Sequence, residues 1–162
     1  MAYSMILVML ILAIALLLPH HYEKIPLTKE LCFGMKPVEV RLAYGKPDTA
    51  HSSDISDSII YTYQVRDGGY MIEIHLSFVR VHLHHELSEA SFLFLDIPVD
   101  HIIPLKEDLI EQCREAFSCN TGCYEQEDGV ATTLEINKNA VILYLRFEAS
   151  NSGVRVDMSR IY

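Results

Sequence analysis

Residues 31–48, LCFGMKPVEVRLAYGKPD, are the stretch around which the rest of the chain is organised. Pro37 suits the first position of a helix, Gly45 suits the left-handed residue after the last turn, and Pro47 prevents continuation. The stretch therefore predicts a helix of about two turns between Pro37 and Gly45.

A helix this short is unstable alone and has to pack on another element. Val38 and Leu42 lie four residues apart on it, so they share a face that we expect to be buried. The chain supplies a partner, because apolar and polar side chains alternate in residues 59–65 and again in residues 70–78. The sequence DGG at residues 67–69 predicts the turn between them. We expect a hairpin with one wet face and one buried face, which the helix covers.

The later chain predicts one more helix and several more strands. Leu109, Cys113 and Phe117 fall at helical spacing and Pro104 stands at the entry, so residues 104–117 are expected to be helical. The Ser- and Asp-rich residues 48–58 predict an exposed loop. Further strands are expected at residues 79–85, 90–97, 129–136, 140–148 and 154–158.

The order of these signals resembles the BamE (SmpA/OmlA) family of small envelope proteins. The family pattern is L-x-x-G-M-x-x-x-(E/Q)-V, then G-x-P, then a strand with Tyr or Trp, and it matches roughly residues 28–80. Lys36 and Pro37 depart from it, because the family usually has a capping Ser or Thr there. The resemblance implies a non-catalytic structural or assembly factor that binds another protein. The residues that carry it are Leu31, Gly34, Met35, Glu39, Val40, Gly45, Pro47 and Tyr61 or Tyr63.

The second half of the chain repeats the order of the first, one helix followed by strands. This tandem order resembles the β-lactamase inhibitor protein and implies an alternative function, an inhibitor or immunity-type protein that blocks an enzyme. Convergence on the same simple order is the other explanation, because the Gly-Met pattern has no counterpart before Leu109. The expected fold class is α+β, with an N-terminal membrane helix followed by one or two helix-plus-antiparallel-sheet units. The expected boundaries are residues 1–19 for the anchor or signal segment, 20–27 for a linker, 28–98 for the first unit and 99–162 for the second.

An uncharged apolar run extends between Ala2 and Leu18. It is at the lower limit for a membrane-spanning helix and longer than a typical signal-peptide core, so both interpretations stay open. We favour an uncleaved membrane anchor, because residues 17–22, LLPHHY, lack a small-x-small peptidase pattern. The lysines after the run favour a cytoplasmic domain. The family resemblance instead implies an inner-membrane anchor with the domain outside the cytoplasm, in a bacterial-type envelope, and we adopt that location. No Cys stands just after the run, so the lipid attachment of the family is absent.

The formal net charge is -9 at pH 7. Non-specific nucleic-acid binding needs a basic surface that neutralises phosphates, and no Lys/Arg cluster with interleaved aromatic residues occurs. An acidic surface suits a basic partner, or it only keeps the protein soluble. We therefore expect another protein, and no nucleic acid, as the partner.

Four cysteines invite a disulfide hypothesis if the domain faces an oxidising compartment. The natural pairing is Cys119 with Cys123, across a Gly-containing turn, and Cys32 with Cys113, although four cysteines allow three pairings. No matching Cys or His pair stands at zinc spacing, so we expect no structural zinc site.

Three histidines, His82, His84 and His85, stand beside Glu86, with His75 on the neighbouring strand. On a strand, alternate histidines point to the same face, which is a geometry that a transition metal can use. The alternative, which we favour, is an ordinary polar face of a half-buried sheet. No nucleophile elbow, metalloprotease helix or phosphate-binding loop occurs. We therefore expect no catalytic residue, no metal and no cofactor.

Overall fold

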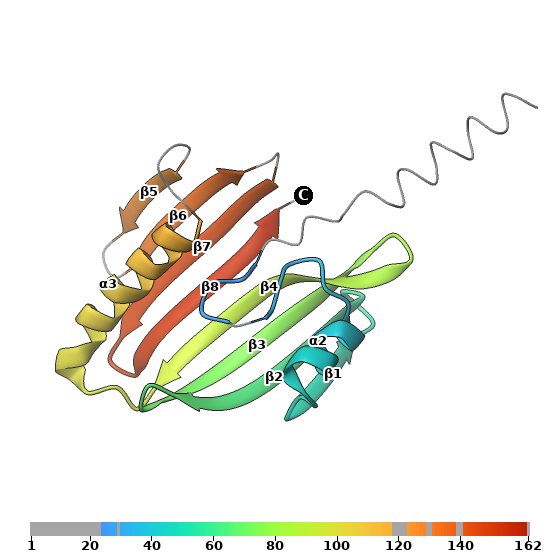
Figure 1. The fold of residues 1–162 in the computed structure, drawn as a ribbon, viewed down its shortest axis with the longest axis horizontal. Coiled ribbons are helices and arrows are strands. Elements are labelled where there is room, and N and C mark those ends of the chain that lie inside the picture. The colour runs from blue at the N-terminus through green and yellow to red at the C-terminus, as the bar shows by residue number, and fades with distance from the viewer. Residues whose placement is uncertain (1–23, 29, 118–122, 129–130, 139–140, 162) are drawn as a thin grey trace, which may run out of the picture.

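The computed structural model describes residues 24–28, 30–117, 123–128, 131–138 and 141–161. In these ranges the chain forms two helices and one eight-stranded antiparallel sheet, with strand order β1-β2-β3-β4-β8-β7-β6-β5 (Figure 1). The helices are α2 (Pro37–Tyr44) and α3 (Val99–Ala116). The strands are β1 (Thr49–Ser53), β2 (Ser58–Asp67), β3 (Tyr70–Val81), β4 (His84–Leu95), β5 (Cys123–Asp128), β6 (Ala131–Lys138), β7 (Val141–Ser150) and β8 (Gly153–Ile161).

Each helix is followed by four strands that pair in chain order, and the two sets of strands join where β4 pairs with β8. The junction runs from Glu89 opposite Ser159 to Phe94 opposite Val154. The expected fold class, one or two helix-plus-antiparallel-sheet units, is therefore wrong, because all eight strands belong to one continuous sheet. Pairing β4 with β8 satisfies backbone groups that two separate sheets would each leave on an open edge.

The expected fold class also included a membrane helix, and this expectation is corrected as well. Among the described ranges, no helix is both long enough and apolar enough to cross a membrane. The apolar run between Ala2 and Leu18 lies outside the described residues.

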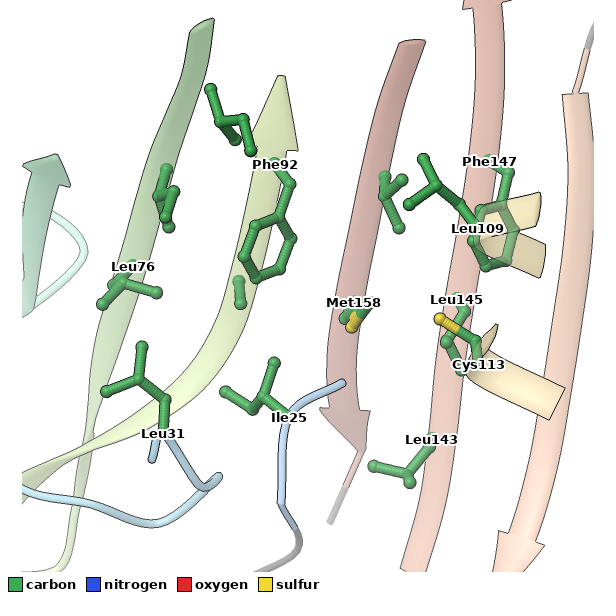
Figure 2. Packing of buried hydrophobic residues seen from close by; sticks show 14 of the residues in the cluster. Ile25, Leu31, Leu76, Phe92, Leu109, Cys113, Leu143, Leu145, Phe147 and Met158 are labelled. Carbon is green, nitrogen blue, oxygen red and sulfur yellow. The ribbon is translucent and has the colours of Figure 1, made fainter. Parts of the chain in front are cut away.

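One face of the sheet is covered and buries the core. Both helices and the irregular segment of residues 24–28 and 30–36 lie on this face, with the segment between the two helices (Figure 1). Figure 2 shows Ile25 and Leu31 of that segment near the buried side chains of β3 and β4, and Cys113 of α3 near Leu145. The strands contribute to this core at every second position, as in β3, where Ile72, Ile74, Leu76 and Phe78 are buried.

Helix α2 has the predicted length, but it is rotated relative to the prediction. Val40 is fully buried, whereas Val38 is 52% exposed and Leu42 is 83% exposed. Tyr44, four residues after Val40, packs edge to face on Tyr63 of β2 with ring centroids 5.5 Å apart. This aromatic contact places the Val40 side of the helix on the sheet, so the expected burial of Val38 and Leu42 is wrong.

Helix α3 begins earlier than predicted. It starts at Val99, and Pro104 lies inside it instead of at its first position. The added turn buries Ile102 in the core, which explains why the helix extends on the N-terminal side of the proline.

Two strand predictions are also corrected. The expected loop at residues 48–58 contains β1, a short and mostly exposed edge strand. The expected strand at residues 79–85 is divided by a tight turn at His82 and Leu83, so that Val81 pairs with His84. His82 adopts a left-handed φ of 55° there, which is uncommon for a residue other than glycine and which the alternating pattern does not reveal.

Candidate functional site

The side of the sheet opposite α2 and α3 is called here the open face. Its side chains alternate along each strand with those of the core, so in β3 His75 and Ser77 point to it while Leu76 is buried. None of the described helices packs on it, since both lie on the other side (Figure 1). The open face is therefore the large surface of the sheet that is available for contacts.

The middle of the open face is hollowed into a trough of about 500 Å³. It crosses the junction of β4 and β8 and reaches β2, β3 and β7. Polar groups and apolar side chains both contribute to its surface, including Ile60, His75, Ser91, Tyr144, Arg155 and Asp157.

Asp157 is the centre of the hydrogen-bond network in the trough. The Ser91 hydroxyl donates to its Oδ1 across 2.6 Å, from the neighbouring strand. The Arg155 Nε lies 2.9 Å from both carboxylate oxygens. Hydrogen bonds that involve a charged group are stronger than neutral ones, so these side chains hold one another in fixed positions.

Two further charge pairs border this network. The imidazole Nε2 of His75 lies 2.6 Å from Oε1 of Glu73, and Gln64 donates to the same carboxylate. The hydrogen bond from His75, followed by that from Gln64, lowers the pKa of Glu73. Arg146 lies 3.3 Å from Glu148 on the same strand. Most of the charge at the trough is therefore neutralised internally.

Ser91 stands between His75 and Asp157 in the register of the sheet, which brings together the residue types of a hydrolytic triad. The hydrogen bonds differ from those of a triad, because the serine donates to the aspartate while the imidazole pairs with Glu73. The backbone N–H groups of these central strands also take part in pairing with their neighbours, so they lie in the sheet instead of pointing toward a ligand on the open face.

The motif residues of the sequence resemblance lie on the other side of the sheet and have structural contacts. Glu39 accepts a hydrogen bond from the backbone N–H of Lys36 at the start of α2, across 2.6 Å. Tyr63 donates its hydroxyl to the carbonyl of Gly45, across 3.1 Å, and burial raises the pKa of Tyr63 to about 12. The buried members of the motif are Leu31, Gly34, Val40, Pro47, Tyr61 and Tyr63.

Gly34 and Met35 bind the irregular part of β4. The Gly34 N–H donates to the carbonyl of Leu87 across 2.9 Å, and the Leu87 N–H donates to the carbonyl of Met35 across 2.8 Å. The pairing of β3 with β4 shifts register here, because Ser88 is an extra residue between Leu87 and Glu89. The Gly-Met motif therefore anchors the N-terminal segment to a β-bulge.

The predicted disulfide between Cys32 and Cys113 is wrong. The two cysteines are not joined, and the side chain of Cys113 is buried between α3 and the sheet, where desolvation raises the pKa of its thiol to about 12. Of the second predicted pair, Cys119 lies outside the described residues and only the backbone of Cys123 is described.

The histidines of the sequence cluster do not converge. His84 lies 2.6 Å from Glu86, and His85 lies 3.2 Å from Asp57 of the neighbouring hairpin. The hydrogen bond from Arg80 is the main reason why the pKa of Asp57 is lowered, with a smaller effect from His85. Within the described part of the chain, no group of three or more His, Cys, Asp or Glu side chains could hold a metal ion.

Comparison with protein families, with characterised proteins and with solved structures finds no significant match. The open face and its trough are therefore the features of this chain that bear on its function. Sequence reasoning identified a wet sheet face on β3 but missed the trough, because nearly half of the residues that line it come from β7 and β8. The available signal was the alternation of Tyr144 and Arg146 with buried residues.

Proposed function

We propose that the protein is a non-catalytic binding module that holds a partner protein on the open face of its sheet. The observation that carries this proposal is the trough, which lies at the centre of an eight-stranded surface that neither of the described helices covers. A protruding loop or helix of a folded partner would enter the trough, and the flanking strands would contact the rest of that partner.

The composition of the open face fits a protein interface. Ile60 and Tyr144 are 37% and 38% exposed, and they flank the polar network at Asp157. Interfaces combine aromatic and aliphatic contacts with hydrogen-bonding groups, and tyrosine is frequent among the residues that dominate binding. Asp157 is hydrogen-bonded to Ser91, and Glu73 is hydrogen-bonded to His75. Because these side chains are already ordered, binding would cost less side-chain entropy.

The size of the open face is also sufficient. Eight strands at the usual spacing span about 34 Å across the sheet. The central strands β3 and β4 have 12 residues each, so a partner could contact a broad area on both sides of the trough. A stable protein complex typically buries about 800 Å² on each partner, which a surface of these dimensions can supply.

Two versions of this function differ in the class of partner. An assembly or structural factor would hold a component of a larger complex, whereas an inhibitor would cover the active site of an enzyme. The inhibitor is kept as the alternative because of the hollow shape of the open face, since a trough can enclose a protruding segment of an enzyme. Identification of the partner decides between them.

The test is photo-cross-linking from matched positions on the two sides of the sheet. Benzoylphenylalanine replaces either Ile60, in the trough, or Ile103, on the exposed surface of α3. The full-length protein is irradiated in cells of its source, and the products are identified by mass spectrometry. We expect a defined protein to be cross-linked from Ile60, and the purified pair to form a complex. The same yield from Ile103, or no product from Ile60, would refute the proposal.

A further inference from the structure

One row of the open face combines an aromatic ring with two carboxylates. In the register of the sheet, Glu89 of β4 is opposite Ser159 of β8, Ser159 is opposite Tyr144 of β7, and Tyr144 is opposite Glu135 of β6. These four residues, called here the Tyr144 row, alternate with buried residues and so point to the open face. The usual strand spacing puts the two glutamates about 14 Å apart, with the tyrosine between them.

The two glutamates differ from the other charged groups at the trough. Arg146 is paired with Glu148, and Arg155 is paired with Asp157. Among the described residues, neither Glu89 nor Glu135 has a hydrogen-bond or ion-pair partner. The uncompensated charge in this part of the open face is therefore negative, in agreement with the net charge of -9 for the whole chain.

We propose that the Tyr144 row receives a cationic side chain, preferably arginine, from the protein that binds to the open face. This inference rests on the proposed function and adds the chemistry of the partner. A guanidinium group stacks on the face of a tyrosine ring and can also donate paired hydrogen bonds to a carboxylate. Glu89, Ser159 and Tyr144 all line the trough, so the cation would enter the hollow while Glu135 borders it from β6.

The charges of the neighbouring rows favour this occupant. An anionic segment would meet two carboxylates without partners, and it would have to displace Glu148 or Asp157 from an arginine. A purely apolar segment would leave Glu89 desolvated and unpaired, which is costly. A segment with an exposed arginine meets neither penalty.

The experiment uses the full-length protein labelled with ¹⁵N and a defined probe, a blocked peptide that contains three arginines separated by glycines. The control peptide contains citrulline in place of each arginine, which preserves the shape and removes the charge. Amide chemical shifts are followed during titration. With the arginine peptide, we expect saturable shifts centred on the Tyr144 row. The citrulline peptide should bind with an apparent affinity at least about fivefold lower.

Variants locate the effect. The double variant Glu89→Gln with Glu135→Gln should weaken binding of the arginine peptide about fivefold. A matched double variant on α3, Glu107→Gln with Glu115→Gln, changes the net charge equally and should have no effect. Tyr144→Ala should weaken binding and Tyr144→Phe should restore it, because phenylalanine keeps the aromatic face.

Three results would overturn the inference: equal binding of the citrulline peptide, shifts scattered over the whole acidic surface, or equal effects of the two double variants. Any of them would leave the cross-linking comparison of Ile60 with Ile103 unchanged, since that comparison does not depend on charge. Loss of the cross-link at Ile60 would instead remove the proposed function itself.

Discussion

Ser91 on β4 donates its hydroxyl proton to Asp157 on β8 across 2.6 Å, on the open face of the sheet. The two residues are directly opposite each other at the junction that joins the first four strands to the last four. Because Arg155 donates to the same carboxylate, this contact both strengthens the junction and orders the centre of the trough.

A double-mutant cycle tests the contribution of this contact to stability. Asp157→Ala leaves the half-buried Ser91 hydroxyl without its acceptor, so we expect the free energy of unfolding to fall by about 1–2 kcal/mol. Combined with Ser91→Ala, the cycle should give a coupling energy of about 1 kcal/mol. Urea unfolding measures both quantities. Arg155→Ala, which removes only the more exposed pair, is the control and should cost less than about 1 kcal/mol. A coupling energy of zero would contradict the assigned hydrogen bond.

Gly153 is expected to be the glycine that tolerates substitution least. It has a φ of 148°, and a Cβ added to it would lie 2.0 Å from the carbonyl oxygen of Phe94. Gly69 also has a positive φ, but a Cβ there would meet no atom within 4 Å. Gly69→Ala should therefore cost only the backbone strain, about 1–2 kcal/mol.

Gly153→Ala should cost clearly more than that, at least about 3 kcal/mol, because β8 would have to move away from β4. Thermal and urea unfolding of the two variants provide the comparison. Equal losses of stability would show that β8 does not approach β4 as closely as the structure has it.

The geometry also predicts that Cys113 is an unreactive thiol. Burial raises its pKa to about 12, so almost none of it is thiolate at neutral pH. With iodoacetamide at pH 8 and no reductant, peptide mapping should find Cys113 unmodified in the native protein and alkylated after unfolding in urea. Recovery of Cys113 in a disulfide, or alkylation at the same rate in both states, would contradict its place in the core.

Glu73 should titrate below its ordinary pKa of 4.5, because the hydrogen bond from His75 lowers that value. A carboxylate whose pKa is lower in the folded state adds stability above its unfolded pKa, and that stability is lost as the pH falls through the folded pKa. The stability advantage over Glu73→Gln should therefore be complete above pH 4.5 and disappear below it.

NMR titration of the carboxyl carbon checks this assignment directly. His75→Ala should move the pKa of Glu73 up toward its ordinary value. His82→Ala, at the tip of the β3–β4 hairpin, should leave the titration curve unchanged. An unchanged curve for His75→Ala would show that the imidazole is not the group that lowers the pKa of Glu73.

Local structure was predictable from local signals. Pro37 and Gly45 bound α2 as predicted, and the hairpin of β2 and β3 follows the alternating pattern around residues 67–69. The rotation of α2 was not predictable, because it depends on the contact of Tyr44 with Tyr63, and these residues are far apart in the sequence. Helical spacing states which residues share a face, but the tertiary contacts decide which face is buried.

The candidate site was not predictable for a related reason. The trough exists because β4 pairs with β8, which brings Ser91 next to Asp157 across 66 residues of sequence. Each strand has a clear alternation of its own, but no local pattern specifies which distant strand becomes its neighbour. The sequence therefore predicted a solvent-exposed face of the sheet but not the trough at its centre.

The most direct test of the central claim uses the partner protein that is cross-linked at position 60. Its affinity is measured for two matched tryptophan variants. Ser91→Trp fills the trough, whereas Ile103→Trp adds the same bulk to the exposed surface of α3. Circular dichroism and urea unfolding first establish that both variants are folded. Calorimetry should then show that Ser91→Trp weakens binding at least about tenfold, a loss of about 1.4 kcal/mol, and that Ile103→Trp binds like the native protein. Unchanged binding by Ser91→Trp, or an equal loss with Ile103→Trp, would contradict the assignment of the open face as the binding surface.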